Sequence, residues 1–208
     1  GKPMVAESGN VTIKEDTYKD TTFKGIQIFK AKVTQDLEGA SNWNGPKTLS
    51  DITWASEDVE KAVTGAFGDG DTTKPSDNDA QKWADWLKTK TEDEYKSGTT
   101  EDEYKSGTDK TTKLDAGTTL DTIAKALEDA NIMEGTDECQ TSTDGTFTGL
   151  NTGYWLFVTK SVSVNTNATA GNTDTFSSPI FAVVGGSAET ITPKKQVPTV
   201  TKAVMDDA

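Results

Sequence analysis

The sequence predicts a mostly β, α+β fold in which a β-sandwich carries a helical insertion between its early and late strands. β-rich segments stand near both ends of the 208-residue chain, and amphipathic helical patterns occupy its middle. Because strands and helices are segregated along the sequence, a layered α+β domain fits better than a repeating βαβ series.

The early part of the chain is predicted to form strands. Residues 10–14 alternate apolar and polar side chains, and residues 22–33 form a longer β-rich run in which Ile26 and Ile28 are in phase. The Asn, Gly and Pro content of residues 41–51 predicts a loop after this run.

Three amphipathic helices are predicted between about residues 55 and 130. The first begins at the N-cap Ser56, has acidic residues in its first turn and stops at Gly68. The second runs from about 78 to 90, and the third from 117 to 130. Their apolar stripes follow helical spacing: Val59, Ala62, Val63, Ala66 and Phe67; then Ala80, Trp83, Ala84 and Leu87; then Leu120, Ile123, Ala124 and Leu127.

A tandem duplication separates the second helix from the third. Residues 91–99 and 100–108 both read TEDEYKSGT. In each copy the first threonine and the glutamate three residues later fit the capping-box spacing, and the glycine can end the turn. We expect two short helical turns in an exposed connection, a tolerated surface duplication; the alternative is an exposed ligand or antigenic site.

Strand patterns return after Gly145. Residues 153–164 are the most hydrophobic stretch, residues 177–186 predict a short buried strand closed by paired glycines, and residues 188–195 predict another strand.

Composition excludes several classes of function. The formal charge is −13 and the pI about 4.4, which opposes binding to nucleic acid and to anionic membranes. The chain has no His and no Arg, so it lacks the commonest general base, zinc ligand and anion clamp. Cys139, the only cysteine, has neither a disulfide partner nor a histidine to activate it. No cofactor is expected. No membrane insertion is expected either, since no apolar run approaches the ~18–20 residues that a membrane-spanning helix needs.

The segment of residues 68–79 is rich in aspartate, which raises the question of a metal site. It lacks the calcium-loop spacing, so turn formation and helix capping are the better account, and no metal is predicted. The aspartates concerned are Asp69, Asp71, Asp77 and Asp79. Among 34 acidic residues no pair has a spacing that singles it out for glycoside hydrolysis, and no enzymatic activity is predicted.

Tryptophans could form a sugar-stacking platform, although most of them stand in or beside patterns for which core packing is the default. They are Trp43, Trp54, Trp83, Trp86 and Trp155.

Five segments together resemble one family. They are "TFKGIQIFKA" (22–31), "AGTTLDTIAKAL" (116–127), "GYWLFV" (153–158), "SPIFAVVGG" (178–186) and "TPKK" (192–195). This order resembles the N-terminal domain of sortase-assembled Gram-positive pilus backbone subunits, the major pilins, in which "GYYL", "SPI…VVG" and a terminal "YPK"-type motif follow one another.

The resemblance implies an immunoglobulin-like β-sandwich with a helical insertion over about residues 55–130. Residues 1–195 would form the pilin N-terminal domain, and residues 196–208 a linker and the first strand of a following pilin domain. An extracellular, cell-wall-anchored pilus is then the expected location. The LPXTG-type sorting signal is absent, as expected for an N-terminal part of such a subunit.

The resemblance also implies the chemistry. Lys194 matches the pilin-motif lysine, whose amine attacks a sortase-bound thioester of another subunit and forms an intermolecular isopeptide bond. The sequence departs from the family in having Thr192 in place of tyrosine and Lys195 in place of asparagine, which leaves Lys195 as the alternative acceptor. Lys202 matches the isopeptide lysine of the following domain.

The expected partners are neighbouring pilin subunits, a pilus-specific sortase and a host or glycan receptor. The alternative function is a carbohydrate- or matrix-binding adhesin module, a tip or basal pilin on the same fold. An internal isopeptide bond in the N-terminal domain stays open, because no motif selects a pair among Lys14, Lys24, Lys30 and Lys32 on one side and Asn165 and Asn172 on the other.

Overall fold

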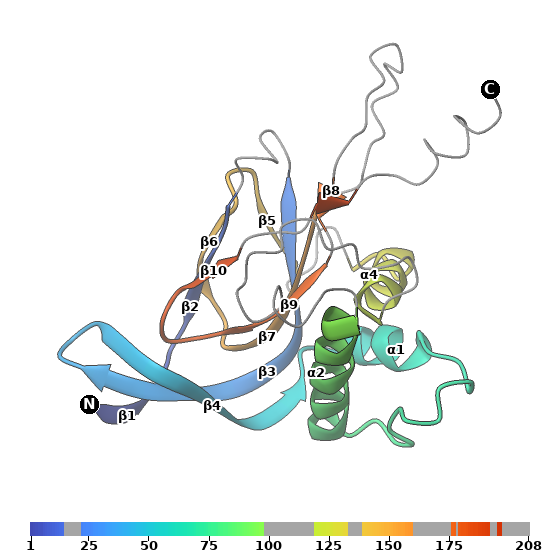
Figure 1. Cartoon of the computed structure of the whole chain (residues 1–208), viewed down its shortest axis with the longest axis horizontal. Coiled ribbons are helices and arrows are strands. Elements are labelled where there is room, and N and C mark those ends of the chain that lie inside the picture. The colour runs from blue at the N-terminus through green and yellow to red at the C-terminus, as the bar shows by residue number, and fades with distance from the viewer. Residues whose placement is uncertain are drawn as a thin grey trace, which may run out of the picture.

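Two packed β-sheets, a short two-stranded sheet and a layer of helices make up the described part of the chain in the computed structural model (Figure 1). It describes residues 1–14, 22–97, 119–132, 139–159, 176–177, 179–191 and 195–196. The larger sheet contains β1 (Lys2–Val5), β3 (Phe23–Glu38), β4 (Asn42–Trp54), β5 (Cys139–Ser142), β7 (Gly153–Thr159) and β9 (Ile180–Val184). The smaller contains β10 (Glu189–Ile191), β2 (Gly9–Ile13) and β6 (Thr146–Leu150), and β8 (Phe176–Ser177) pairs with β11 (Lys195–Gln196).

The 16-residue strand β3 is the central strand of the larger sheet, because most of the other strands of this sheet pair with it. Its first half pairs with β5 on one edge and β7 on the other, and its second half pairs with β4 and β1. Beyond the sandwich, β3 and β4 continue as a long two-stranded hairpin, which we call the arm (Figure 1). β1 pairs with β3 along this arm, so the described N-terminus lies at the arm end of the molecule.

One hydrophobic core lies between the two sheets. Alternate residues of the larger sheet, such as Phe23, Trp155 and Phe157, face Val11 and Phe147 of the smaller sheet. The alternation predicted for residues 10–14 is therefore confirmed, since β2 buries every second residue. A β-sandwich arrangement of two packed sheets follows.

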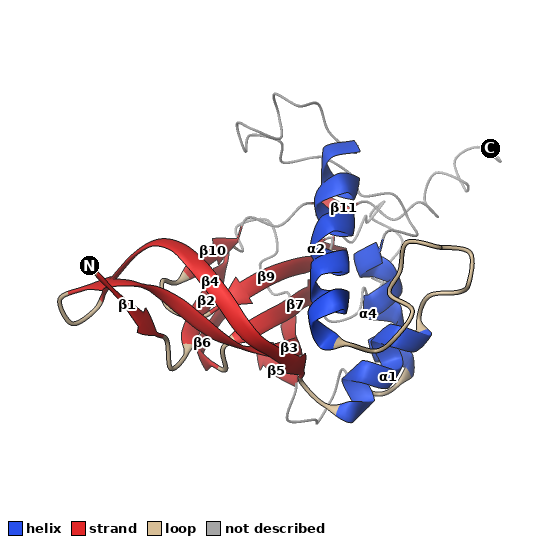
Figure 2. Ribbon diagram, turned by 90° about the horizontal axis from the view of Figure 1, so that it is seen from below, coloured by secondary structure: helices blue, strands red, loops and turns tan. Residues whose placement is uncertain are grey.

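A second core lies on the opposite face of the larger sheet. The helices α1 (Glu57–Gly65), α2 (Ala80–Ser97) and α4 (Thr119–Asp129) pack there together (Figure 2). They bury the predicted stripes, including Val63, Leu87 and Ile123, against Ile26 and Leu156. The N-cap of α1 is also confirmed, because Val59 N donates to Ser56 Oγ at 3.1 Å. No helix in the described part is long and apolar enough to cross a membrane.

The loop predicted at residues 41–51 is wrong, because this segment forms most of β4. Its turn-forming residues are absorbed as irregularities in the ladder: Gly45, Pro46 and Lys47 stand opposite the single residue Gln35. Gly45 has a φ of +80°, which glycine adopts without strain. Pairing with the long β3 strand thus overrides the local turn signal.

The short helical turn predicted for the first copy of the duplication is also wrong. α2 runs through it as far as Ser97, and Thr91 lies inside the helix, where its Oγ1 donates to Leu87 O at 2.8 Å rather than capping a helix start. The helix begins instead after Asp79, whose Oδ1 accepts from Gln81 N at 2.9 Å. The second copy lies outside the described residues.

Candidate functional site

The strand that leads to the expected acceptor lysine lies in the smaller sheet. β10 runs parallel to β2, with Ile191 beside Ile13, and Lys14 N donates to Ile191 O at 2.9 Å. Ile13 N in turn bonds Gly145 O in the turn between β5 and β6. β10 therefore ends at the end of the sandwich that is remote from the arm.

The three lysines implied by the resemblance fall at or beyond this point. Lys194 and Lys202 lie outside the described residues. The backbone of Lys195 is described in β11, where it pairs with Ser177 of β8. In the sequence, Lys194 falls between β10 and β11.

The lysines considered for an internal bond differ in exposure. Lys24 is buried at 4 % exposure on β3, whereas Lys14, Lys30 and Lys32 are exposed. Both candidate asparagines lie outside the described residues.

A buried polar network ties the arm to the turn between β9 and β10. Gln35, which is 4 % exposed, donates from Nε2 to Gly45 O at 2.7 Å and to Ser187 Oγ at 3.0 Å. Its Oε1 accepts from Ser187 N at 2.9 Å. Beside it, Lys47 Nζ donates to Ser187 O at 2.9 Å and to Glu189 at 2.8 Å. Because these groups satisfy one another, they fix the arm against the β9–β10 turn and the first residue of β10.

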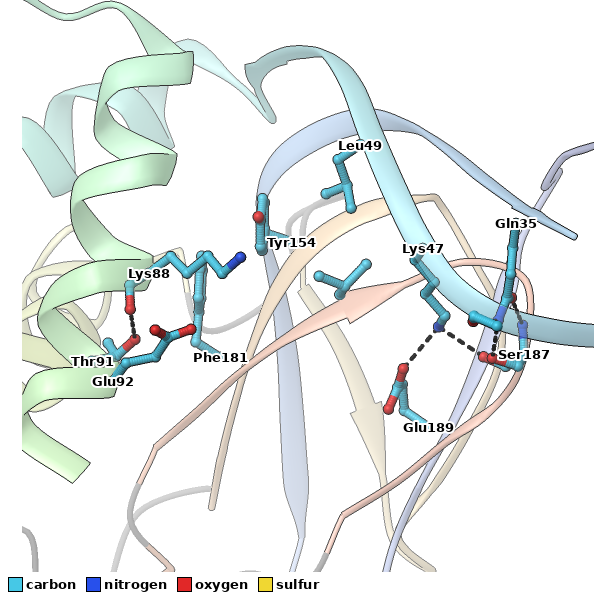
Figure 3. Close-up of a pocket in the computed structure, with 12 residues that line it drawn as sticks. Gln35, Lys47, Leu49, Lys88, Thr91, Glu92, Tyr154, Phe181, Ser187 and Glu189 are labelled. Atoms are coloured by element: carbon cyan, nitrogen blue, oxygen red, sulfur yellow. Dashed lines mark hydrogen bonds and ion pairs between the residues drawn. The ribbon is translucent and has the colours of Figure 1, made fainter. Parts of the chain in front are cut away.

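A groove of about 480 Å³ opens between this network and α2 (Figure 3). Leu49 of β4, Tyr154 of β7 and Phe181 of β9 supply its apolar lining, and Lys88 and Glu92 of α2 stand on the far wall. The rings of Tyr154 and Phe181 are stacked, with centroids 4.9 Å apart and an interplanar angle of 1°. The groove thus combines a stacked pair of aromatic rings with polar walls.

Tyr154 is a buried residue of this groove that carries a polar group. It is 8 % exposed, and burial raises the pKa of its phenol, with a further contribution from the negative charges of Asp85 and Glu92. The hydroxyl therefore stays protonated at neutral pH and can donate a hydrogen bond.

Sequence reasoning did not find this groove, because its residues come from β3, β4, α2, β7 and β9 together with the β9–β10 turn. The sequence did contain one indication of a buried polar site. Gln35 follows Ala31 and Val33 in the inward phase of β3, where a polar side chain needs buried partners.

The aspartates of residues 68–79 act within the fold, as predicted. Asp71 accepts from Thr73 N at 3.0 Å and pairs with Lys90 at 2.9 Å, and Asp77 pairs with Lys82 at 2.7 Å. Over the described part of the chain, no group of three or more potential ligands is placed to hold a metal ion.

The Asp71–Lys90 pair predicts a specific pH response. The hydrogen bond from Lys90, followed by those from Thr73, lowers the pKa of Asp71 from 3.8 to about 2. A lowered native pKa contributes stability that is present above the unfolded value and is lost as pH falls from about 4 towards 2. In Lys90→Ala we expect the Asp71 pKa to rise towards 3.8 and this part of the pH dependence to shrink, measured by NMR titration of the carboxyl carbon.

Lys88→Ala is the matched control, because Lys88 lies on the same helix but on the groove side. It should leave the Asp71 titration unchanged. An Asp71 that titrates near 3.8 in the unmodified protein would contradict the role assigned to Lys90.

The tryptophans do not form one platform. Trp83 and Trp155 are buried, and Trp54 and Trp86 are partly buried against the helical core. Trp43 alone of the five stands on the arm, opposite Leu37 and half-buried. Core packing therefore accounts for four of them.

Comparison of the chain with models of protein families and with curated proteins finds no match.

Proposed function

We propose that this chain is the N-terminal domain of a pilus shaft subunit that a sortase polymerises through Lys194, with Lys195 as the alternative acceptor. In this proposal the two-sheet sandwich is immunoglobulin-like and the helical layer is the insertion of the family fold. The chain is then a building block of a cell-surface fibre that supports adhesion, and a sortase substrate rather than a catalyst.

The observation that supports this proposal best is where the described N-terminus and the end of β10 lie relative to the two ends of β3. The N-terminal strand β1 pairs with residues 34–37, whereas β5, whose turn contacts the end of β2 beside Ile191, pairs with residues 23–26. A 16-residue strand spans about 50 Å. Along β3, the described N-terminus therefore lies on the arm side, whereas Ile191 at the end of β10 lies towards the other end of the sandwich. This arrangement supports head-to-tail stacking of subunits.

The chemistry is an acyl transfer. The neutral ε-amine of the lysine attacks the carbonyl carbon of a sortase thioester, an amide bond forms, the C–S bond breaks and the sortase thiol is released. The amine must first lose a proton, because a solvated lysine has a pKa of about 10.4. A basic group of the sortase or a nearby carboxylate must accept that proton.

The direct test incubates the protein with the pilus-specific sortase and a labelled LPXTG-type peptide as acyl donor, then maps the modified lysine by mass spectrometry. Label on Lys194 or Lys195 is the expected result. Label spread over exposed lysines such as Lys30 and Lys32, or none at all, would overturn the proposal.

A further inference from the structure

The hydroxyl of Tyr154 has no hydrogen-bond partner among the residues that the structure describes, although the side chain is 8 % exposed. Buried polar atoms in proteins are nearly always satisfied by protein groups or by a bound molecule. Tyr154 lines the groove beneath the arm, and its ring stacks on the half-buried Phe181 (Figure 3). Within the described part of the chain, this unpaired hydroxyl therefore lies where the packed core borders a concave site.

The residues that line the groove carry equal numbers of positive and negative charges. On one wall, Lys47 and Glu189 neutralise each other through an ion pair of 2.8 Å. On the other wall, Lys88 and Glu92 present one positive and one negative group, and within the described part neither side chain forms an ion pair. The charges of the four lining residues therefore cancel, and the nearby Asp85 disfavours an anion, whereas the groove offers both donors and acceptors to a neutral ligand.

We propose that this groove binds a neutral saccharide, with the half-buried Phe181 ring, which is backed by Tyr154, against the apolar face of a sugar ring. The Tyr154 hydroxyl, Lys88 and Glu92 would bond its hydroxyl groups. Sugars present an apolar C–H face and a rim of hydroxyls, and the groove presents an aromatic surface beside polar walls. Its volume of about 480 Å³ lies within the usual range of small-ligand sites. This site goes beyond the pilus proposal and does not depend on the acceptor lysine.

A peptide strand fits this groove less well. Tyr154, Phe181 and Val183 project into it from the face of the sheet, so the groove offers side chains rather than the unpaired backbone edge that β-strand addition uses. A neutral sugar makes use of the free hydroxyl, the charged pair and the aromatic surface together.

The test is an NMR titration of the ¹⁵N-labelled protein with maltose, lactose and N,N′-diacetylchitobiose at millimolar concentrations. We expect at least one of them to shift amide signals in β9 and the second half of α2. Tyr154→Phe keeps the ring stack and removes only the hydroxyl, so folding should be unchanged while the dissociation constant rises about 2- to 13-fold. The double variant Lys88→Met with Glu92→Gln should weaken binding further.

Trp43→Ala is the matched control, because Trp43 is an aromatic side chain on the arm outside the groove lining. Binding should survive in this variant. The proposal is overturned if none of the three sugars shifts these signals, if Tyr154→Phe binds as tightly as the unmodified protein, or if Trp43→Ala alone abolishes binding. The last result would place a sugar site on the arm instead.

Discussion

Replacing both Lys194 and Lys195 with alanine is expected to abolish sortase-dependent attachment of an LPXTG-type donor to this chain. The reacting group is a primary amine, and an alanine methyl group cannot replace it. Other lysines can substitute only if they reach the thioester in the correct orientation, and loss of positioning alone reduces such reactions by more than about 100-fold. Gel analysis of the sortase reaction, with the label on the donor, measures the loss.

The single variants decide which lysine acts. If Lys194 is the acceptor, Lys194→Ala should lose attachment while Lys195→Ala retains it, and the reverse result would assign Lys195. Lys30→Ala is the control, since Lys30 is an exposed lysine on the larger sheet. Attachment that persists in the double variant would refute the backbone-pilin assignment.

Replacing Trp83 with alanine is expected to lower the free energy of unfolding by about 3–5 kcal/mol. Trp83 is 2 % exposed in the core between the helices and the larger sheet, with ring centroids of Trp54, Phe67 and Trp86 between 5.4 and 6.2 Å away. Its indole nitrogen also donates to Asp77 O at 2.7 Å, so truncation leaves both a cavity and a lost hydrogen bond. Urea denaturation followed by circular dichroism measures the change.

Trp43→Ala again supplies the control, because half-buried Trp43 lies on the arm and should cost less than about 1 kcal/mol. If Trp83→Ala does not fold, Trp83→Phe keeps most of the volume and should show a smaller loss in the same assay. A change below about 1 kcal/mol in Trp83→Ala would mean that the helical layer contributes little to the stability of the sheet.

Amphipathic patterns predicted the sandwich and the helices, because both depend on which side chains must leave water. β2 and β7 bury alternate residues towards the core between the sheets, and α1, α2 and α4 bury the stripes read from their spacing. The structure also explains why a glycine stands at position 186. Gly186 has a φ of +76° and lies so close to Gln35 Oε1 that a Cβ atom would overlap it.

Two local signals failed because partners distant in sequence overruled them. Gly45 and Pro46 indicated a loop, but β3 offers a long edge with which β4 can pair, and the excess residues are accommodated opposite Gln35. Thr91 indicated a helix start, but α2 already runs through that position from its cap at Asp79. A signal for a start has no effect within a helix that tertiary packing already holds.

The sequence by itself determined the class of this protein's fold, the positions of its buried stripes and the acidic charge, and it contains the lysines that we propose as acyl acceptors. The tertiary structure decided the rest: that the TEDEYKSGT duplication begins within α2, that the arm is bonded to the β9–β10 turn, and that Tyr154 lines a groove with charged residues of both signs. The physical reason is the range of each interaction. Burial periodicity is set by neighbouring residues, whereas a groove lined from several elements exists only when strands distant in sequence pair in one register.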